Sequence, residues 1–316
     1  MSRYLISRFL LLIPTLFLAS ILIFAIITLS PGDPAQIRLG TEATEEQIAA
    51  ERERLGLDEP IPVRYAVWVT DVMRFDLGRS LVNNRPAAEL VAAAFPNTLR
   101  LVLLALALSL LIGIPMGIIA AVRQNSPLDL AITGMSSLGL AVPSFWLGIM
   151  LILVLSVRYR WLPPSGAGDP DEFFISNIKF LIMPVITIAV SNIAVFSRFI
   201  RSAMIDTLAT DYVRTARAKG LPERIVLTQH ALRNALLPTV TVLGIQFGRL
   251  LGGAVVTESV FSYPGIGRLV ISSILNRDYP VVQATLMFVV LVFLVMNLLV
   301  DLSYAYLDPT VKFDGR

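Results

Sequence analysis

The chain has 316 residues, of which 55% are hydrophobic and 16% are charged. Soluble domains carry about 25% charged residues, so this composition favours a membrane protein. The absence of cysteine excludes a disulfide framework, a thiolate metal site and a cysteine nucleophile. The formal net charge of +3 is small and does not indicate a nucleic-acid-binding protein.

Six apolar runs are each long enough to cross a bilayer. They are Phe9–Leu29, Leu101–Val122, Leu130–Val157, Phe180–Ser197, Ala235–Thr257 and Val281–Val300. A spanning helix needs about 20 apolar residues, and helices satisfy their own backbone hydrogen bonds in lipid. The first run is longer than the roughly 7–15-residue core of a signal peptide, so we expect it to be retained. The sequence therefore predicts an all-α membrane protein with six transmembrane helices.

The basic residues predict how these helices are oriented. With the N-terminus in the cytoplasm, 12 basic residues fall in cytoplasmic segments and five fall in the short outside loops. Both termini are then cytoplasmic. Residues 30–97, with a net charge of −4, form a long outside segment, whereas residues 198–233 carry +4 and lie inside.

The outside segment contains a helix signal. Thr44 followed by Gln47 matches a capping box and predicts a short, charged helix over Glu45–Leu55, which Gly56 ends. The surface of this helix is either solvated or available to an extracytoplasmic partner.

Two of the predicted spans carry small residues at four-residue spacing, which lets another helix backbone approach closely. In the second span these are Ala105, Ser109, Gly113, Gly117 and Ala121, and in the fifth they are Gly244, Gly248 and Gly252. We interpret both rows as packing seams. Each seam packs either within this chain or against a second membrane subunit.

A few polar side chains in the spans define a candidate translocation pathway. Arg249 lies near the middle of a span, where a charge costs about 2.5–3.5 kcal/mol and normally faces a polar cavity or a partner. The other candidates are Gln246 on the same span and Ser191, Asn192 and Asn297 on other spans. Alternatively, Arg249 pairs with a carboxylate such as Glu258 and is structural.

The sequence lacks the motifs of an enzyme. None of the three lysines follows a glycine, so the Gly-Lys-Ser/Thr end of a phosphate-binding P-loop is missing. The single histidine, His230, rules out a histidine-rich metal site, and we expect it to be an exposed helix residue. No G-x-S-x-G nucleophile motif occurs. We therefore expect no catalytic residue, metal or cofactor in this chain, and we expect any ATP to bind to another chain.

The predicted cytoplasmic loop 199–234 has the most informative design. Thr210 and Asp211 are positioned to cap a short helix that Gly220 ends, and Pro222 then opens a second helix that runs to Asn234. Ala216 and Ala218, beside Gly220, offer a small apolar surface. This arrangement predicts a docking site for a cytosolic partner.

Residues 211–221, DYVRTARAKGL, resemble the EAA loop of ABC importer permeases. Ala216, Gly220 and Leu232 match the general family pattern, whereas Arg214 and Thr215 replace its Glu-Ala. His230 and Arg233 likewise replace Ile and Pro, and these replacements are typical of the oligopeptide, dipeptide and nickel branch. Five further motifs fit that branch in order: SPGDP at 30–34, FDLGRS at 75–80, VPSFWLG at 142–148, WLPP at 161–164 and FSYPGIG at 261–267.

This resemblance implies the first of two membrane subunits of a bacterial ABC importer, with a type I importer transmembrane fold. It implies residues 1–94 as a transmembrane helix plus an extracytoplasmic segment, 95–305 as the transmembrane domain and 306–316 as a cytoplasmic tail. Loop residues Arg214, Thr215, Ala216, Gly220 and Leu232 would couple the subunit to its ATPases.

The implied partners are a second homologous permease, two ATPases that bind ATP and Mg, and an extracytoplasmic substrate-binding protein, at the bacterial inner membrane. Small peptides are the first substrate class that the resemblance implies. Glutathione, nickel chelates, opines and oligosaccharides are alternatives. A self-contained channel or secondary transporter would need its own coupling-ion groups in the membrane, and the spans contain no carboxylate.

Overall fold

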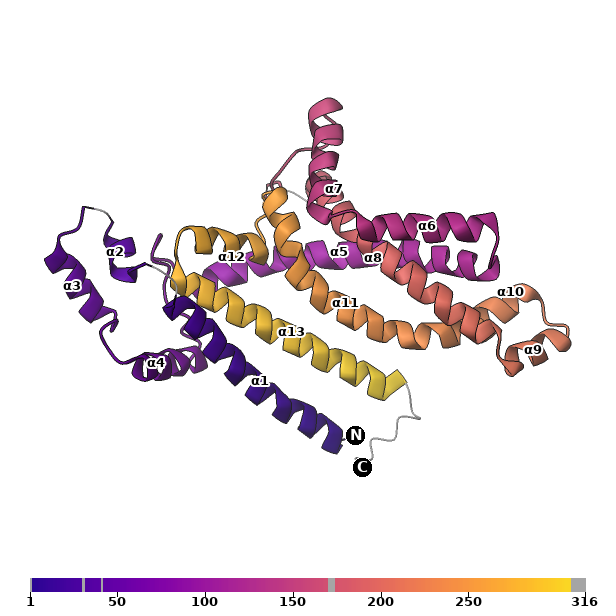
Figure 1. Ribbon diagram of the computed structural model, residues 1–316, viewed down its shortest axis with the longest axis horizontal. Helices are drawn as coiled ribbons and strands as arrows, with labels where there is room; N and C mark the ends of the chain where they lie inside the picture. The colour runs from indigo at the N-terminus through magenta and orange to yellow at the C-terminus, as the bar shows by residue number, and fades with distance from the viewer. Residues whose placement is uncertain (1, 30–31, 41, 170–173, 308–316) are drawn as a thin grey trace. The chain divides into compact units, whose positions relative to one another are not determined.

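A computed structural model describes residues 2–29, 32–40, 42–169 and 174–307 (Figure 1). Their regular structure is helical and contains no strand beyond one isolated bridge between Arg79 and Pro86. These residues form two compact units. Two of their three boundaries fall inside the long helices α5 (Ala87–Val122) and α13 (Tyr279–Leu307), and the third lies between residues 263 and 264. The core unit is residues 99–263 with 296–307, and the N-terminal unit is residues 2–98 with 264–295.

The remaining elements fall within one unit or the other. The N-terminal unit holds α1 (Ser2–Thr28), α2 (Pro34–Leu39), α3 (Glu45–Arg54), α4 (Ile61–Met73) and α12 (Ile266–Leu275). The core unit holds α6 (Pro127–Ala141), α7 (Ser144–Leu151), η1 (Ile152–Arg158), α8 (Phe174–Leu208), α9 (Asp211–Ala218), α10 (Glu223–Ile225), η2 (Val226–Leu232) and α11 (Arg233–Val260).

Among the described residues, four helices are long and apolar enough to cross a membrane. They are Leu10–Thr28, Ala87–Val122, Asn177–Leu208 and Tyr279–Leu299. The second and third of these contain the second and fourth predicted spans, and the first and last cover the first and sixth predicted spans except for terminal residues. The pair α6 and α7–η1 adds a fifth if the pair is one span. The remaining predicted span, 235–257, lies within the 28-residue helix α11, part of whose side chains falls outside the described residues.

The third predicted span is not one straight helix. It is broken between α6 and α7, whose axes differ by 95°. Val142 at the break is extended, with φ −75° and ψ 121°, because the ring of Pro143 disfavours the helical conformation at the residue before it. Pro143 also lacks the N–H that would continue the helix. The apolar run predicted the length of this segment correctly but missed the bend.

The core unit is organised around α8. This helix packs against α6, α7 and α11, and Figure 1 shows α6 and α11 on different sides of it. Its inward face is large and fully buried, with Phe196, Ile200 and Met204 all at 0% exposure. Burying apolar surface of this kind helps to stabilise the unit.

The second-span seam lies against α8. A Cβ added to Gly117 would lie 2.6 Å from the Ser197 carbonyl oxygen, and one added to Gly113 would lie 3.0 Å from that of Ile193. Close backbone contact therefore requires glycine at both positions. The fifth-span row does not form one continuous seam within this chain, because Gly244 and Gly248 are buried whereas Gly252 is exposed on the single chain.

The N-terminal unit has its own small core where α5, α12 and α13 meet. Val91 of α5, Ile266 of α12 and Val281 of α13 are buried together. Asp278 fixes the chain before α13, since its carboxylate accepts hydrogen bonds from the Ser80 hydroxyl and, at 2.9 Å, from the Leu81 amide.

The capping box predicted in the outside segment is confirmed. The Thr44 hydroxyl accepts from the Gln47 amide, and the Gln47 side chain accepts from the Thr44 amide. The helix that follows, α3, spans Glu45–Arg54, and Gly56 has a left-handed φ of +65°. The boundaries predicted at residues 94 and 305 stay a prediction, and residues 308–316 of the predicted tail lie outside the described residues.

Candidate functional site

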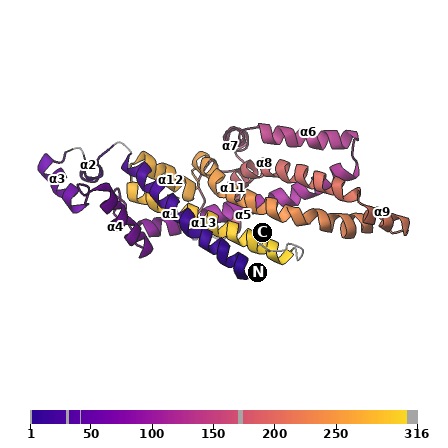
Figure 2. The same cartoon turned by 60° about the horizontal axis from the view of Figure 1, so that its bottom comes forward.

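The predicted docking loop is a short helix, a glycine turn and a return segment. In both views α9 lies beyond the end of α8 (Figures 1 and 2). Gly220 has φ +77°, its amide donates to the Arg217 carbonyl at 2.9 Å, and the Leu221 amide donates to the Ala216 carbonyl at 3.4 Å. These two bonds form a Schellman motif, which reverses the chain and requires the left-handed conformation that glycine adopts readily.

Ala216 does not lie on the surface of this loop. It is 5% exposed and packs with Val213 and Val226, which are both fully buried, against Leu208. Val213 and Ala216 are three residues apart and share one helix face, and that face turns inward. The expectation that Ala216 supplies the small docking surface is therefore wrong. Of the two alanines, Ala218 is the one that is exposed beside Gly220.

The start of α9 also differs from the expected cap. Thr210 is the N-cap residue, but its hydroxyl donates to the Thr207 carbonyl at 2.6 Å and makes no cap bond to α9. Because that hydroxyl bonds backward to the end of α8, it joins two consecutive helices.

Surface contacts brace the loop. Arg217 pairs with Glu223 at 2.7 Å across the glycine turn, and this guanidinium holds the pKa of the Glu223 carboxyl below its usual range. The Asn234 amide donates to the Tyr212 hydroxyl at 2.7 Å, and that hydroxyl donates to the His230 carbonyl at 3.3 Å. His230 is half-buried rather than exposed as expected.

The return segment is continuous with a long helix. The expected separate helix from Glu223 to Asn234 instead runs through α10 and the wider π-helical turn η2 directly into α11. Leu232 is half-buried against a cluster formed by Ala121, Ile200, Met204, Ala231 and Ala235. Movement of the loop is therefore connected mechanically to α11, α8 and the end of α5.

The exposed face of the loop is the part available to a partner. Its residues include Arg214, Thr215, Ala218 and Leu221, and the last is 36% exposed. Of the predicted coupling residues, Arg214, Thr215 and Gly220 lie on this face, whereas Ala216 and Leu232 support it from within.

The polar residues predicted for a pathway have different environments. The Gln246 amide donates to the Asn192 side-chain oxygen at 2.8 Å, and both side chains are buried between α8 and α11. Ser191 and Asn297 are half-buried, and Arg249 is exposed on the single chain. Glu258 is fully buried on the same helix, whereas Arg249 is exposed.

The comparison with protein families decides the class of the molecule. Residues 113–313 match the family model described as the inner membrane component of binding-protein-dependent transport systems. Residues 1–102 match the model of the N-terminal part of such membrane components. The chain belongs to this family of ABC importer permeases.

Curated relatives of the permease agree over its whole length. It is 41% identical, over 99% of its own chain and 100% of theirs, to the glutathione transport system permease proteins GsiC of Escherichia coli strain K12 and of Salmonella typhi.

Solved structures show the fold. An inward-facing structure of the MetNI methionine ABC transporter has a TM-score of 0.59 at 16% identity, covering 69% of the permease and 96% of that chain. A crystal structure of an amino acid ABC transporter has a TM-score of 0.55 at 17% identity, covering 69% and 94%. The permease therefore has the type I importer fold that its motifs predicted.

Sequence reasoning missed one strong interaction in the permease. Arg201 of α8 forms a two-pronged ion pair with Asp129 of α6, with Nε–Oδ1 and Nη2–Oδ2 distances of 2.6 and 2.8 Å. Asp129 also accepts from the Asn125 amide at 2.9 Å, and its own amide donates to the Ser126 hydroxyl oxygen. The signal was present, since a carboxylate three residues after a serine cap begins an apolar run that is otherwise uncharged.

Proposed function

We propose that the permease imports small peptides as one of two membrane subunits of an ATP-driven importer. The supporting observations are the sequence motifs that resemble the oligopeptide, dipeptide and nickel branch and the 41% identity, over the whole chain, to the GsiC glutathione permeases. Selectivity would reside largely in a separate extracytoplasmic binding protein.

The proposed assembly contains a second homologous permease, two ATPases and the binding protein. ATP and Mg would bind to the ATPases, and this chain would bind neither. The exposed loop residues Arg214, Thr215, Ala218 and Leu221 would contact an ATPase.

The proposed topology has both termini and the loop at 199–234 in the cytoplasm and residues 30–97 outside. The excess of basic residues in the short inside segments supports this orientation. Cysteines introduced singly at Glu51 and Glu223 should be labelled from opposite faces of the membrane, and labelling of both from the same face would contradict it.

The proposed mechanism is alternating access. Closure of the ATPases would move α9, and the Schellman turn would transmit that movement through η2 into α11 and through the Arg201–Asp129 pair into α6. Asn192 and Gln246 would hold α8 to α11 during this movement. Arg249, exposed on the single chain, would face the pathway or the second permease, and the half-buried Ser191 and Asn297 would add polar groups to that pathway.

Glutathione is a specific second candidate because GsiC proteins are named for it. It is itself a tripeptide, so both candidates share amide bonds, a free amino group and at least one carboxylate.

Uptake into vesicles containing the complete transporter tests the substrate class. Labelled dipeptide, longer peptide and glutathione should be compared, each with the binding protein outside the vesicle and ATP inside it. ATP-dependent uptake of ordinary dipeptides supports the proposal, whereas uptake of glutathione alone selects the second candidate. Uptake of neither, together with transport of a nickel chelate or an oligosaccharide, would refute both.

A further inference from the structure

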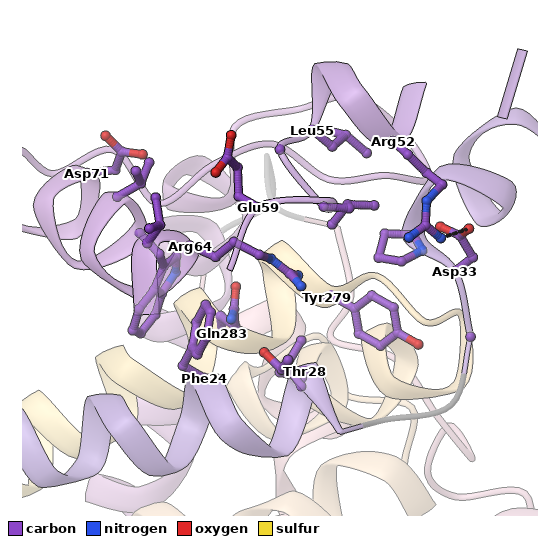
Figure 3. Close-up of a pocket in the computed structure, with 18 residues that line it drawn as sticks. Phe24, Thr28, Asp33, Arg52, Leu55, Glu59, Arg64, Asp71, Tyr279 and Gln283 are labelled. Atoms are coloured by element: carbon purple, nitrogen blue, oxygen red, sulfur yellow. Dashed lines mark hydrogen bonds and ion pairs between the residues drawn. The ribbon is translucent and has the colours of Figure 1, made fainter. Parts of the chain in front are cut away.

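The N-terminal unit contains a pocket that the transport function does not explain. Its volume is about 630 Å³, which is in the range of small-molecule sites. Its walls come from the end of α1, the segment 32–34, the end of α3 with residues 55–59, α4, and the first turns of α13. Figure 3 shows Arg64 extending into this space above Gln283, with Tyr279 on its other side.

The charges of this pocket are only partly satisfied. Asp33 and Arg52 form an ion pair at 2.7 Å, and Asp58 also bonds to Arg52. Within the described residues, no ion pair involves Arg64, Glu59 or Asp71. One guanidinium and two carboxylates therefore face the same space, which suits a ligand that carries both an anionic group and an amine.

The pocket lies at the end of a candidate membrane span, and we infer from this that it lies near the membrane–water boundary. Phe24, Ile27 and Thr28 line it from the last turns of α1, at the end of a candidate membrane span. The rings of Phe24 and Trp68 lie 5.7 Å apart, and aromatic side chains are enriched at this boundary. A lipid headgroup already lies at this depth, whereas a dissolved peptide would have to reach it from the water.

Helix α4 has the character of a helix that lies in the interface. Ile61, Val63, Val67 and Met73 are 57, 45, 57 and 71% exposed, and the following Phe75 is 89% exposed. Five residues of the same helix line the pocket: the apolar Val63 and Val67, and beside them Arg64, Trp68 and Asp71, which are spaced four and three residues apart along one face. An apolar surface beside a charged one is typical of helices that insert into the headgroup layer.

From these observations we propose that the pocket binds the headgroup of an aminophospholipid, the phosphatidylethanolamine class, in the outer leaflet. Arg64 binds the phosphate, and the Gln283 amide is positioned to donate to the same oxygens. Glu59 and Asp71 hold the ammonium group. The acyl chains follow the exposed apolar surfaces of α1 and α4. A purely anionic headgroup is less suitable, because the pocket contains three carboxylates and two guanidiniums.

Lipid retention by the purified full-length permease, together with whatever subunits copurify, tests this site. The protein is equilibrated with equal amounts of phosphatidylethanolamine, phosphatidylglycerol and phosphatidylcholine and examined by native mass spectrometry. Wild-type protein should retain phosphatidylethanolamine preferentially. Equal retention of the three lipids would overturn the proposal without requiring any variant.

Substitutions then locate the site. Arg64→Ala should lower phosphatidylethanolamine retention about tenfold, as expected for the loss of one charge-assisted contact. Glu59→Gln should shift the preference toward phosphatidylglycerol, because it removes a negative charge. Arg74→Ala is the matched control, since Arg74 is an exposed arginine at the end of the same helix and outside the pocket.

Two results would contradict the lipid assignment. One is unchanged lipid retention in both Arg64→Ala and Glu59→Gln. The other is displacement of the bound lipid by a dipeptide, which would make this pocket a peptide site. Neither result depends on which substrate the transporter carries.

Discussion

Two regions of the core unit are held together in opposite ways. The α5–α8 seam depends on the lack of side chains at Gly113 and Gly117, which allows the backbone of one helix to contact the backbone of the other. The predicted docking loop depends on three small buried side chains, Val213, Ala216 and Val226, with an ion pair and hydrogen bonds on its outside. The seam leaves no room for added atoms, whereas the loop excludes them only from its interior.

This difference fits the tasks proposed for the two regions. A helix pair packed backbone to backbone moves as one body, because neither helix can shift without a clash. A loop with a small core and an exposed face retains its shape while it presents polar and apolar groups to a partner. The predictions below test each half of this comparison.

The largest effect is expected in the seam. In Gly117→Leu the Cβ alone would meet the Ser197 carbonyl oxygen at 2.6 Å and the Ile200 Cβ at 2.8 Å, so α5 and α8 must separate. We expect a loss of stability at or above the upper end of the ~1–3 kcal/mol range for overpacking. Thermal denaturation and the yield of assembled complex measure it. Gly134→Leu, where an added Cβ meets nothing within 4 Å, is the control and should be tolerated.

The loop should distinguish its inside from its outside. Ala216→Glu would bury a carboxylate between Val213 and Val226 and should destabilise the loop by about 2 kcal/mol or more, with loss of ATPase association. Ala218→Glu, on the exposed face, should leave thermal stability unchanged and weaken only ATPase association and ATP-driven uptake.

ATPase pull-down and thermal denaturation of the two alanine variants separate these effects. If Ala216→Glu is as stable as wild type, the buried cluster does not hold the loop. If Ala218→Glu transports normally, the ATPase contacts another surface.

The placement of these residues shows where sequence reasoning succeeds. Neighbouring residues in the sequence determine the capping box at Thr44, the glycine turn at Gly220 and most of the apolar runs. The fold class followed from run lengths, and the family followed from motifs in order. These features needed no knowledge of which distant segments meet.

The features that sequence reasoning missed depend on how segments pack against one another in the folded chain. The sequence shows that Ala216 is small, but only the packing of α9 on Val226 shows that its face turns inward. The pairing of Asp129 with Arg201 joins residues 72 positions apart. The break at Val142 was visible in the sequence as a proline, yet the uninterrupted apolar composition around it favoured a straight helix.

The core unit also contains a third kind of contact, the ion pair between α6 and α8. Removing this pair should lower stability by an intermediate amount. Asp129 is 3% exposed and Arg201 is 28% exposed, so the pair is partly shielded from water. Asp129→Asn keeps the shape of the side chain but removes its charge, and it should lower the stability of the folded state by about 1.5–3 kcal/mol, the range for hydrogen bonds to charged groups.

The double variant Asp129→Asn, Arg201→Gln distinguishes the pair from its members. In thermal denaturation, the double variant should lose less stability than the two single variants lose when their losses are added, because each single change already removes the interaction. Strict additivity would mean that the two side chains act independently.

The smallest effect is expected on the outside of the loop, where Arg217 and Glu223 are 42 and 52% exposed. Arg217 lowers the pKa of the Glu223 carboxyl from its ordinary value of 4.5, chiefly by hydrogen bonding. A carboxyl whose pKa is lower in the folded state stabilises that state above the ordinary pKa. This contribution is lost as the pH falls through the folded-state value. Because both groups are well exposed, solvent screening limits the contribution to less than about 1 kcal/mol.

Hydrogen exchange of amides 211–225 should therefore be slightly faster in Glu223→Gln than in wild type above pH 4.5, and this difference should shrink at lower pH. Asp211→Asn, which breaks a looser pair with Arg214 at 3.3 Å and 94% exposure of the carboxylate, is the control and should match wild type throughout. A Glu223→Gln effect as large as that of Ala216→Glu would mean that the surface contacts, and not the buried cluster, hold the loop together.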